Sequence, residues 1–479
     1  MSLFFIVFLL CVVILLGNKR LTTKVAIFFI SITSQQNFSF INIGIGIALI
    51  AFSFIQPYWY FYSMPLSLFV FGLIILTHGI YIFRAEEQAY IEFVKKIHKN
   101  YFKCSIPLMV IFTTISMTVL FRSYLGPLGD LRACSSGNNL NIVCGFKKPP
   151  EDIAITPDNN YILISGFGGI APLQDSELPE TGLIMIMDPY TKTKQPINIS
   201  FGENIWGDGI CSRDPEAEFN PHGIDLVKRD DGKFQFGVIN HWPDETIEMF
   251  ELVEKDSNQE NNEGSELFPW ELVWRGCVRV PDTNYLNDLS LATDGSLFAT
   301  HMYPRDITLS EFLLKSITRG DTGYVLRWDN LIGFSEVAES RGGQPNGVFY
   351  EQELEILHVV LNLSDKIVAI DLQTNQIINS LSLDSPDNLV FDGENLWVTN
   401  LEHSILDPLI CDKTACPLPF KVSKINPQNY KVIQSWIFAG EPFGLPSVAI
   451  PISNEMISGE IFVGSFRSDR LAYFNADFK

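Results

Sequence analysis

The chain has 479 residues and a formal net charge of −21, with 55 acidic against 34 basic side chains. Residues 1–150 carry 12 basic and four acidic side chains, so the negative charge belongs to the rest of the chain. A part this acidic excludes nucleic acid as a partner. Its excess carboxylates suit bound cations or a solvated surface. The uneven charge and apolar content predict two parts, a membrane region over 1–122 and a soluble domain over 123–479.

Four apolar stretches in the first part each have about the length that a membrane-spanning helix needs. They are residues 3–17, 40–56, 64–83 and 105–121. The first also fits a secretory signal peptide, and all four fit core helices of a soluble domain. The basic clusters at 19–24 and 95–103 both lie in the cytosol if there are four spans, which places residue 122 onward in the lumen or outside the cell.

From residue 151 the chain changes to short alternating strands separated by Gly, Pro, Asp and Asn. One sequence pattern recurs six times, and it consists of an apolar strand, a turn and a second apolar strand. The copies begin at residues 153, 224, 289, 348, 389 and 448. This repeat predicts a six-bladed β-propeller, whereas the alternative of a two-sheet sandwich needs no repeat. The polar stretch 254–266 is predicted to be a mobile loop between blades.

Polar residues stand just before the first strand of each copy. They are Glu151 with Asp152, His222, Asn287 with Asp288, Asn346, Asp387 with Asn388, and Ser447. The innermost strand of every blade lines the central channel, so these side chains are expected to meet at one end of the tunnel. Converging buried oxygens cost several kcal/mol each unless a cation binds them, and an all-oxygen shell suits calcium. Taken singly, each Asn or Asp also fits an ordinary Asx turn.

The eight cysteines lack the spacing of a zinc site. Two close pairs, Cys134 with Cys144 and Cys411 with Cys416, predict short disulfide-closed loops in an oxidising compartment. Glycosylation sequons at Asn198 and Asn362 indicate the same compartment.

Six motifs then carry a family resemblance: PEDI (150–153), FNPHGI (219–224), INH (239–241), LNDL (286–289), PNG (345–347) and PDNL (386–389). In order and spacing they resemble the paraoxonase/arylesterase family over residues 130–479. The resemblance implies two calcium ions in the tunnel. A catalytic ion is implied at Glu151, Asn287, Asn346, Asp387 and Asn388, and a structural ion at Asp152, Asp288 and the main-chain carbonyl of Ile224. It also implies that His222 is the general base acting on water and that His241 orients it.

The chain departs from that family at three places. Three apolar stretches precede 105–121, which matches the single N-terminal helix of the family. The C-terminus lacks a cysteine, so Cys144 needs another partner, such as Cys134. The run Ala299–Tyr303 replaces an Asn-Asp-His run, which changes the expected substrate pocket.

The leading functional prediction is a membrane-anchored, calcium-dependent hydrolase of lactones or aryl esters, with phosphotriesters as side substrates. Calcium polarises the reacting oxygen, and an imidazole with a pKa near neutrality activates water. There is no Gly-x-Ser-x-Gly motif, which disfavours a serine hydrolase. The alternatives are a strictosidine-synthase-like enzyme and a calcium-stabilised binding propeller without activity, in which the ions are structural only.

Overall fold

The computed structural model describes residues 11–21, 35–54, 63–120, 134–169, 181–255, 268–402 and 417–477, except 15, 87, 89–91, 93, 94, 97, 138, 455 and 458. The chain divides into two units. A helical unit contains residues 1–135 and 403–412, and a β unit contains 136–402 and 413–479.

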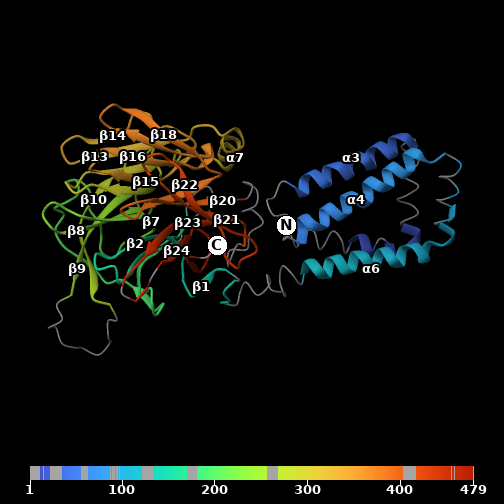
Figure 1. The fold of residues 1–479 in the computed structure, drawn as a ribbon, viewed down its shortest axis with the longest axis horizontal. Helices are drawn as coiled ribbons and strands as arrows, with labels where there is room; N and C mark the ends of the chain where they lie inside the picture. The colour runs from blue at the N-terminus through green and yellow to red at the C-terminus, as the bar shows by residue number, and fades with distance from the viewer. Residues whose placement is uncertain are drawn as a thin grey trace. The chain divides into compact units, whose positions relative to one another are not determined.

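The helical unit contains α3 (Gln35–Ser53), α4 (Ser63–Arg84) and α6 (Tyr101–Leu120). Helices α3 and α4 lie side by side (Figure 1). Glycine permits their close approach, because a Cβ atom on Gly46 would lie 2.7 Å from the Leu76 main-chain nitrogen. The apolar stretches predicted at 40–56, 64–83 and 105–121 thus form helices with nearly the expected bounds.

Within the described residues, one helix is long and apolar enough to cross a membrane, Gln36–Ser53. Leu68–Arg84 and Tyr101–Met117 are shorter apolar helices. Most of the predicted first span, 3–17, lies outside the described residues. The described residues therefore include one candidate membrane helix, and the count of four spans stays a prediction.

The β unit is a six-bladed propeller, as the repeat predicts. Blade 1 consists of β2 (Pro150–Ile155), β3 (Ile162–Gly166), β4 (Leu183–Met187) and β5 (Lys194–Pro196). Blade 2 consists of β7 (Pro221–Lys228), β8 (Phe234–Asn240), β9 (Thr246–Glu254), β10 (Trp270–Arg279) and the added β6 (Ile199–Phe201). Blade 3 consists of β11 (Leu286–Leu291), β12 (Leu297–His301), β13 (Tyr324–Asp329) and β14 (Gly333–Glu336), with α7 (Leu309–Thr318) between β12 and β13.

Blades 4 to 6 follow the same antiparallel order. Blade 4 consists of β15 (Pro345–Glu351), β16 (Ile356–Leu361), β17 (Lys366–Asp371) and β18 (Gln376–Ser382). Blade 5 consists of β19 (Pro386–Phe391), β20 (Leu396–Leu401), β21 (Phe420–Ile425) and β22 (Val432–Phe438). Blade 6 consists of β23 (Pro446–Ile452), β24 (Glu460–Ser465), β25 (Leu471–Asn475) and β1 (Asn141–Val143).

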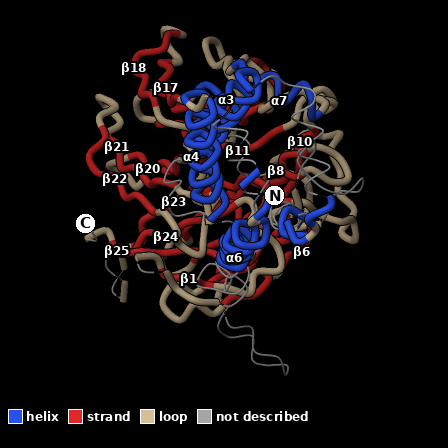
Figure 2. The backbone as a smooth tube through the Cα atoms, turned by 90° about the vertical axis from the view of Figure 1, so that its right-hand side faces the viewer, coloured by secondary structure: helices blue, strands red, loops and turns tan. Residues whose placement is uncertain are grey.

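The ring is closed by pairing its two ends. Strand β1, from the N-terminal side of the domain, pairs antiparallel with the last strand β25. The six first strands β2, β7, β11, β15, β19 and β23 contact one another in sequence and then return to β2. Apolar clusters fill the space between each adjacent pair of blades. Figure 2 shows outer strands such as β18 and β22 at the rim of this domain.

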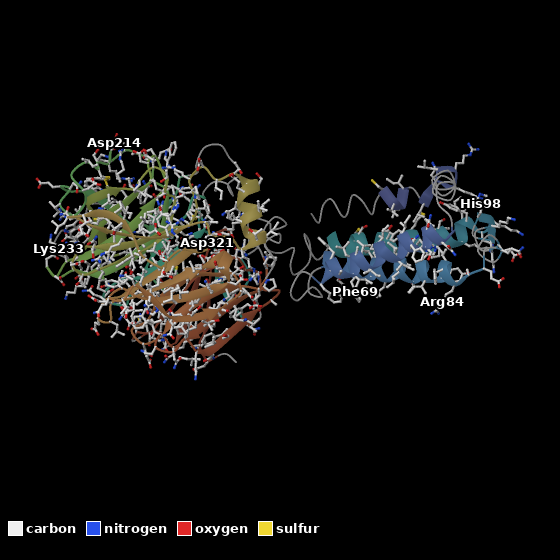
Figure 3. All side chains as sticks on the ribbon, turned by 90° about the horizontal axis from the view of Figure 1, so that it is seen from above. Phe69, Arg84, His98, Asp214, Lys233 and Asp321 are labelled. Carbon is white, nitrogen blue, oxygen red and sulfur yellow. A yellow bond between two sulfur atoms is a disulfide. The ribbon has the colours of Figure 1, made fainter. Side chains whose placement is uncertain are left out.

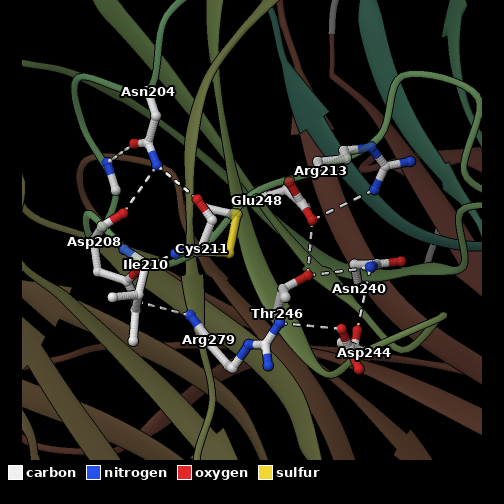
Figure 4. Close-up of a disulfide and its surroundings, with 12 residues drawn as sticks. Asn204, Asp208, Ile210, Cys211, Arg213, Asn240, Asp244, Thr246, Glu248 and Arg279 are labelled. Atoms are coloured by element: carbon white, nitrogen blue, oxygen red, sulfur yellow. Dashed lines mark hydrogen bonds and ion pairs between the residues drawn. A yellow bond between two sulfur atoms is a disulfide. The ribbon is translucent and has the colours of Figure 1, made fainter.

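A disulfide between Cys211 and Cys277 fixes the segment that leads from blade 1 into β7 (Figure 4). Its partners lie 66 residues apart, one in the loop and one in β10. Nearby, Arg213 forms a partly buried ion pair with Glu248 at 3.4 Å. The spacing of these two cysteines in the sequence does not predict the pair. The predicted Cys134 and Cys144 are each disulfide-bonded, while Cys411 and Cys416 lie outside the described residues.

The propeller surface is covered with polar side chains, among them Asp214, Lys233 and Asp321 (Figure 3). The two sequons differ in exposure. Asn198 is exposed, whereas Asn362 is buried and donates its Nδ2 hydrogen to the Pro386 carbonyl at 2.7 Å. The predicted mobile loop 254–266 lies mostly outside the described residues.

If the propeller matures in the secretory pathway, we expect a glycan on Asn198 and none on Asn362, because a glycan at Asn362 would break its core contact. Glycosidase treatment should shift the mass of the wild-type protein. The substitution Asn198→Gln should abolish that shift, and Asn362→Gln should leave it intact. A folded protein with a glycan on Asn362 would contradict the burial argument.

Candidate functional site

Every inner strand of the propeller has a break in its pairing at the same place. The register shifts after Pro150, Pro221, Leu286, Pro345, Pro386 and Pro446. Such bulges leave the extra residues out of the ladder and redirect their side chains. Proline suits the first position because it has no N–H to donate to the ladder. The residues that follow these positions are the polar residues singled out in the sequence.

The bulges bring several predicted residues into contact. The Asn388 side chain donates Nδ2–H to Glu151 Oε1 at 3.3 Å, and His222 Nε2 lies 3.7 Å from the same oxygen. Asn346 donates a side-chain hydrogen bond to Asp387. Asn287 contacts Met302 Sδ with its Nδ2 at 3.7 Å. All the predicted ligand residues and both histidines are at most 6% exposed.

Four oxygens at this end of the tunnel are buried and have no hydrogen-bond partner among the described residues. They are Glu151 Oε2, Asn287 Oδ1, Asn346 Oδ1 and Asn388 Oδ1. Buried polar atoms are normally paired, so this concentration calls for a ligand. No described group of three His, Cys, Asp or Glu side chains forms a metal cage, but the set here mixes amides with carboxylates. Such hard oxygen donors fit a calcium ion.

Two aspartates one position deeper link adjacent blades. Asp152 Oδ2 accepts the Ile224 N–H at 2.7 Å, and Asp288 Oδ2 accepts the Val348 N–H at 2.9 Å. Gly223 leaves room for this arrangement, because a Cβ atom there would lie 2.8 Å from Asp288 Oδ1. Both carboxylates therefore hold inner strands together while they line the tunnel.

The carboxylates at this end have no cationic partner among the described side chains, and burial changes their acidity. Burial raises the pKa of Asp152 to about 7 and that of Asp387 to about 8. Burial, and then the charges of neighbouring carboxylates, raise the pKa of Glu151 and of Asp288 well above the usual range. Without a bound cation the site therefore holds protons at neutral pH.

A second group of residues forms a hydrogen-bonded chain beside Glu151. His222 Nδ1 lies 2.9 Å from His241 Nε2, and His241 Nδ1 lies 2.9 Å from Glu245 Oε2. The carboxylate must accept, so His241 carries its proton on Nδ1 and accepts through Nε2. His222 then donates from Nδ1, which leaves its Nε2 lone pair on the Glu151 side. Burial, and then His241, lower the pKa of His222.

Glu245 was not predicted from the sequence. It is 2% exposed, and its Oε1 also accepts the Leu286 N–H at 2.7 Å, which fixes the carboxylate. The sequence does place a glutamate four residues after His241. A turn separates the two residues, so the sequence does not indicate the direction of the Glu245 side chain.

Aromatic side chains cover the histidines. Phe167 stacks on His222 with ring centroids 4.2 Å apart, and Tyr285 packs edge-on against His241 at 4.8 Å. Asn220 holds the Phe167 segment in place, because its Oδ1 accepts the Gly168 N–H at 2.9 Å and its Nδ2 donates to the Gly169 carbonyl. Phe312 of α7 belongs to the same apolar cluster, so the insertion after β12 contributes to this wall. At the end of β12, His301 Nδ1 accepts the Tyr285 N–H rather than joining the chain of histidines.

No family model and no curated protein matches this chain. Among solved structures it is similar to a luciferin-regenerating enzyme, with 12% identity, 71% of this chain and 96% of that chain covered, and a TM-score of 0.40. It is similar to a gluconolactonase from Xanthomonas campestris, with 12% identity, 72% and 92% covered, and a TM-score of 0.38. A nidogen/laminin complex matches with 10% identity, 63% and 84% covered, and a TM-score of 0.34.

Likenesses at this level carry no argument about activity. The propeller assignment rests on the sheet topology, and the paraoxonase-type resemblance and the ligand roles stay predictions.

We expect the cation-free protein to become more stable as the pH falls from about 8.5 to 7. Asp387 and Asp152 are protonated in the folded state in this range but ionised in the unfolded chain, so folding takes up protons. The gain should be about 1 kcal/mol or more. Below about pH 6.5 the lowered pKa of His222 acts in the opposite direction, because the unfolded chain then binds the extra proton.

Urea unfolding with a chelator present measures this dependence, and Asp387→Asn should reduce the slope. If the free energy of unfolding instead decreased as the pH was lowered from 8.5 to 7, these carboxyls would not be desolvated as described.

Proposed function

We propose that the propeller is a calcium-dependent hydrolase of carboxylic esters, with lactones and aryl esters as its substrate class. The observation that carries the proposal is the chain Glu245–His241–His222, which ends beside four buried oxygens without hydrogen-bond partners in the described structure. An imidazole with a free nitrogen and an unsatisfied oxygen cage are the two parts that metal-assisted ester hydrolysis requires.

Two sets of residues would hold calcium. The outer set is Glu151, Asn287, Asn346, Asp387 and Asn388, and the inner set is Asp152, Asp288 and the Ile224 carbonyl. When bound in the outer set, calcium supplies positive charge that polarises the ester carbonyl and favours the developing oxyanion.

The protein's own groups handle the proton. His222 is neutral at neutral pH because burial lowers its pKa, so Nε2 can accept a proton from water. His241 then shares the positive charge, and the Glu245 carboxylate stabilises it through Nδ1–H. Phe167 and the surrounding aromatic cluster exclude bulk water from His222 and offer an apolar surface to an acyl or aryl group.

The proposal requires that calcium chelation abolish hydrolysis of a panel of lactones and aryl acetates, and that added calcium restore it. Both His222→Gln and Asn346→Ala should lower kcat by about 100-fold or more, because one removes the base and the other a ligand. Only Asn346→Ala should weaken calcium binding, measured by calorimetry. The matched control is His358→Gln, a buried histidine whose ring nitrogens contact Tyr430 and Glu351.

Calcium binding without turnover of any ester would favour a binding propeller with structural ions. Turnover that survives chelation would remove the proposed mechanism.

Glu245→Gln tests the positioning role of the carboxylate. A neutral amide stabilises the His241 cation less and can turn its NH2 toward Nδ1, which reverses the tautomer. We expect kcat to fall by roughly 100-fold while KM stays within about twofold. The control is Glu248→Gln, a nearby buried glutamate that pairs with Arg213 and Trp274. Equal losses in both variants would mean that Glu245 only supports the fold.

We propose a location for the propeller from the candidate membrane helix and the disulfides. The helix Gln36–Ser53 can hold the chain in a membrane, and disulfides persist in oxidising compartments. We place the propeller in the lumen or outside the cell, and the glycan on Asn198 described above tests this placement.

A further inference from the structure

The tunnel has a second opening at the far ends of the inner strands. A cavity of about 600 Å³ lies there, and residues from all six inner strands line it. Its inner end includes Asp152, Ile224 and Asp288, and its outer end includes the exposed Asn159 and Glu394. Glu151 and His222 stand earlier on the same strands and do not line it. The inner set of proposed ligands is therefore reached from the side opposite to the histidines.

The lining of this cavity is acidic and unbalanced. It contains the carboxylates of Asp152, Asp225, Asp288, Asp392 and Glu394, and no lysine or arginine is among the described residues that line it. Asn388 also lines the cavity, is 2% exposed, and its Oδ1 has no hydrogen-bond partner among the described residues. An unpartnered buried oxygen beside uncompensated carboxylates indicates a cation ligand rather than a solvated acidic surface.

Among the residues that line the cavity, Asp225 is the carboxylate next to Ile224 of the inner set. It follows Ile224 on β7, and its two oxygens accept the N–H groups of Leu226 and Leu291 at 2.8 and 2.7 Å. Each oxygen keeps a second lone pair for a further ligand. Burial raises the pKa of Asp225 to about 6.

The charge of Asp225 is not needed to join the blades. At the equivalent place in blade 3, Ser290 Oγ accepts the Tyr350 N–H at 3.0 Å, so a neutral hydroxyl makes the same link. The other four equivalent residues are Ala154, Phe349, Val390 and Ile450. The fold therefore does not require the negative charge of Asp225. Because Asp225 lines the cavity beside the inner set of proposed ligands, its charge points to a role in binding cations.

We propose that the inner divalent cation reaches Asp152 and Asp288 through this opening, and that Asp225 is a third carboxylate of its binding site. Calcium affinity depends on the number of charged ligands, so the third carboxylate slows release of the ion. This inference rests on the calcium binding in the proposed function, but not on hydrolysis.

The test is calcium release from the full-length protein in detergent, mixed rapidly with an excess of a fluorescent chelator. The wild-type protein should release two calcium ions in two phases, and Asn346→Ala identifies the outer ion by the phase that it removes or accelerates. Asp225→Ser keeps a hydrogen-bond acceptor but removes the charge, so it should accelerate the inner phase by about tenfold or more and leave the outer phase unchanged. Ser290→Ala, which removes a blade link without changing charge, should alter neither phase.

Unchanged phases in Asp225→Ser would overturn this inference while leaving the proposed function intact. Acceleration of both phases to the same extent would also overturn it, since the effect would then be a general loss of structure. Two bound ions and the expected Asp225→Ser effect, with no ester hydrolysis, would overturn the proposed function and support the inference. A wild-type protein that binds no calcium would overturn both.

Discussion

The tunnel end gathers more buried oxygen atoms than the protein can supply with hydrogen-bond donors. Glu151, Asn346 and Asn388 come from three different blades, and each has an oxygen without a partner among the described residues. Separating them would relieve the cost of burial, but the closed ring prevents this, because β1 and β25 pair and lock the six blades together. The fold therefore holds the oxygens in an arrangement that a bound cation would stabilise.

The same carboxylates serve the ring and the site. Asp152 and Asp288 each accept an N–H from the next blade, so loss of either would leave a main-chain donor unpaired as well as removing a charge. The glycines of the recurring motifs have a related cause. A Cβ atom on Gly347 would lie 2.7 Å from the Asn388 Cα, as one on Gly223 would crowd Asp288. The residues of the short motifs therefore reflect the steric limits of the ring as well as the chemistry of the proposed calcium ligands.

The sequence predicted the features that recur in every blade. The six inner strands and the polar residues at their bulges, His222 among them, could be found because each blade places its first strand alike, whereas His241 was predicted only from the family resemblance. Contacts made by loops do not repeat, so they could not be found in this way. Glu245 reaches His241 across a turn, Phe167 stacks on His222 from another blade, and Cys211 pairs with Cys277 over 66 residues. Each depends on a loop path that strand periodicity does not specify.

The order of the blades also explains where charge can act. In a ring of six, blade 2 stands opposite blade 5, so His222 and Asp387 belong to opposite sides of the ring, and the blades between them carry the unpartnered oxygens of Glu151, Asn287 and Asn346. Three positions further along the same strands, Asp225 of blade 2 stands opposite Val390 of blade 5 in the ring.

The first pair, His222 and Asp387, consists of an imidazole and a carboxylate, and the blades between them carry side-chain oxygens without hydrogen-bond partners in the described structure. The second sets a carboxylate against an apolar side chain, so no fixed group opposite balances its charge. The N–H groups of Leu226 and Leu291 share this charge, and a divalent ion held in the tunnel would satisfy several such carboxylates at once. The positions of the carboxylates around the ring, more than their number, therefore determine where a cation would bind in this propeller.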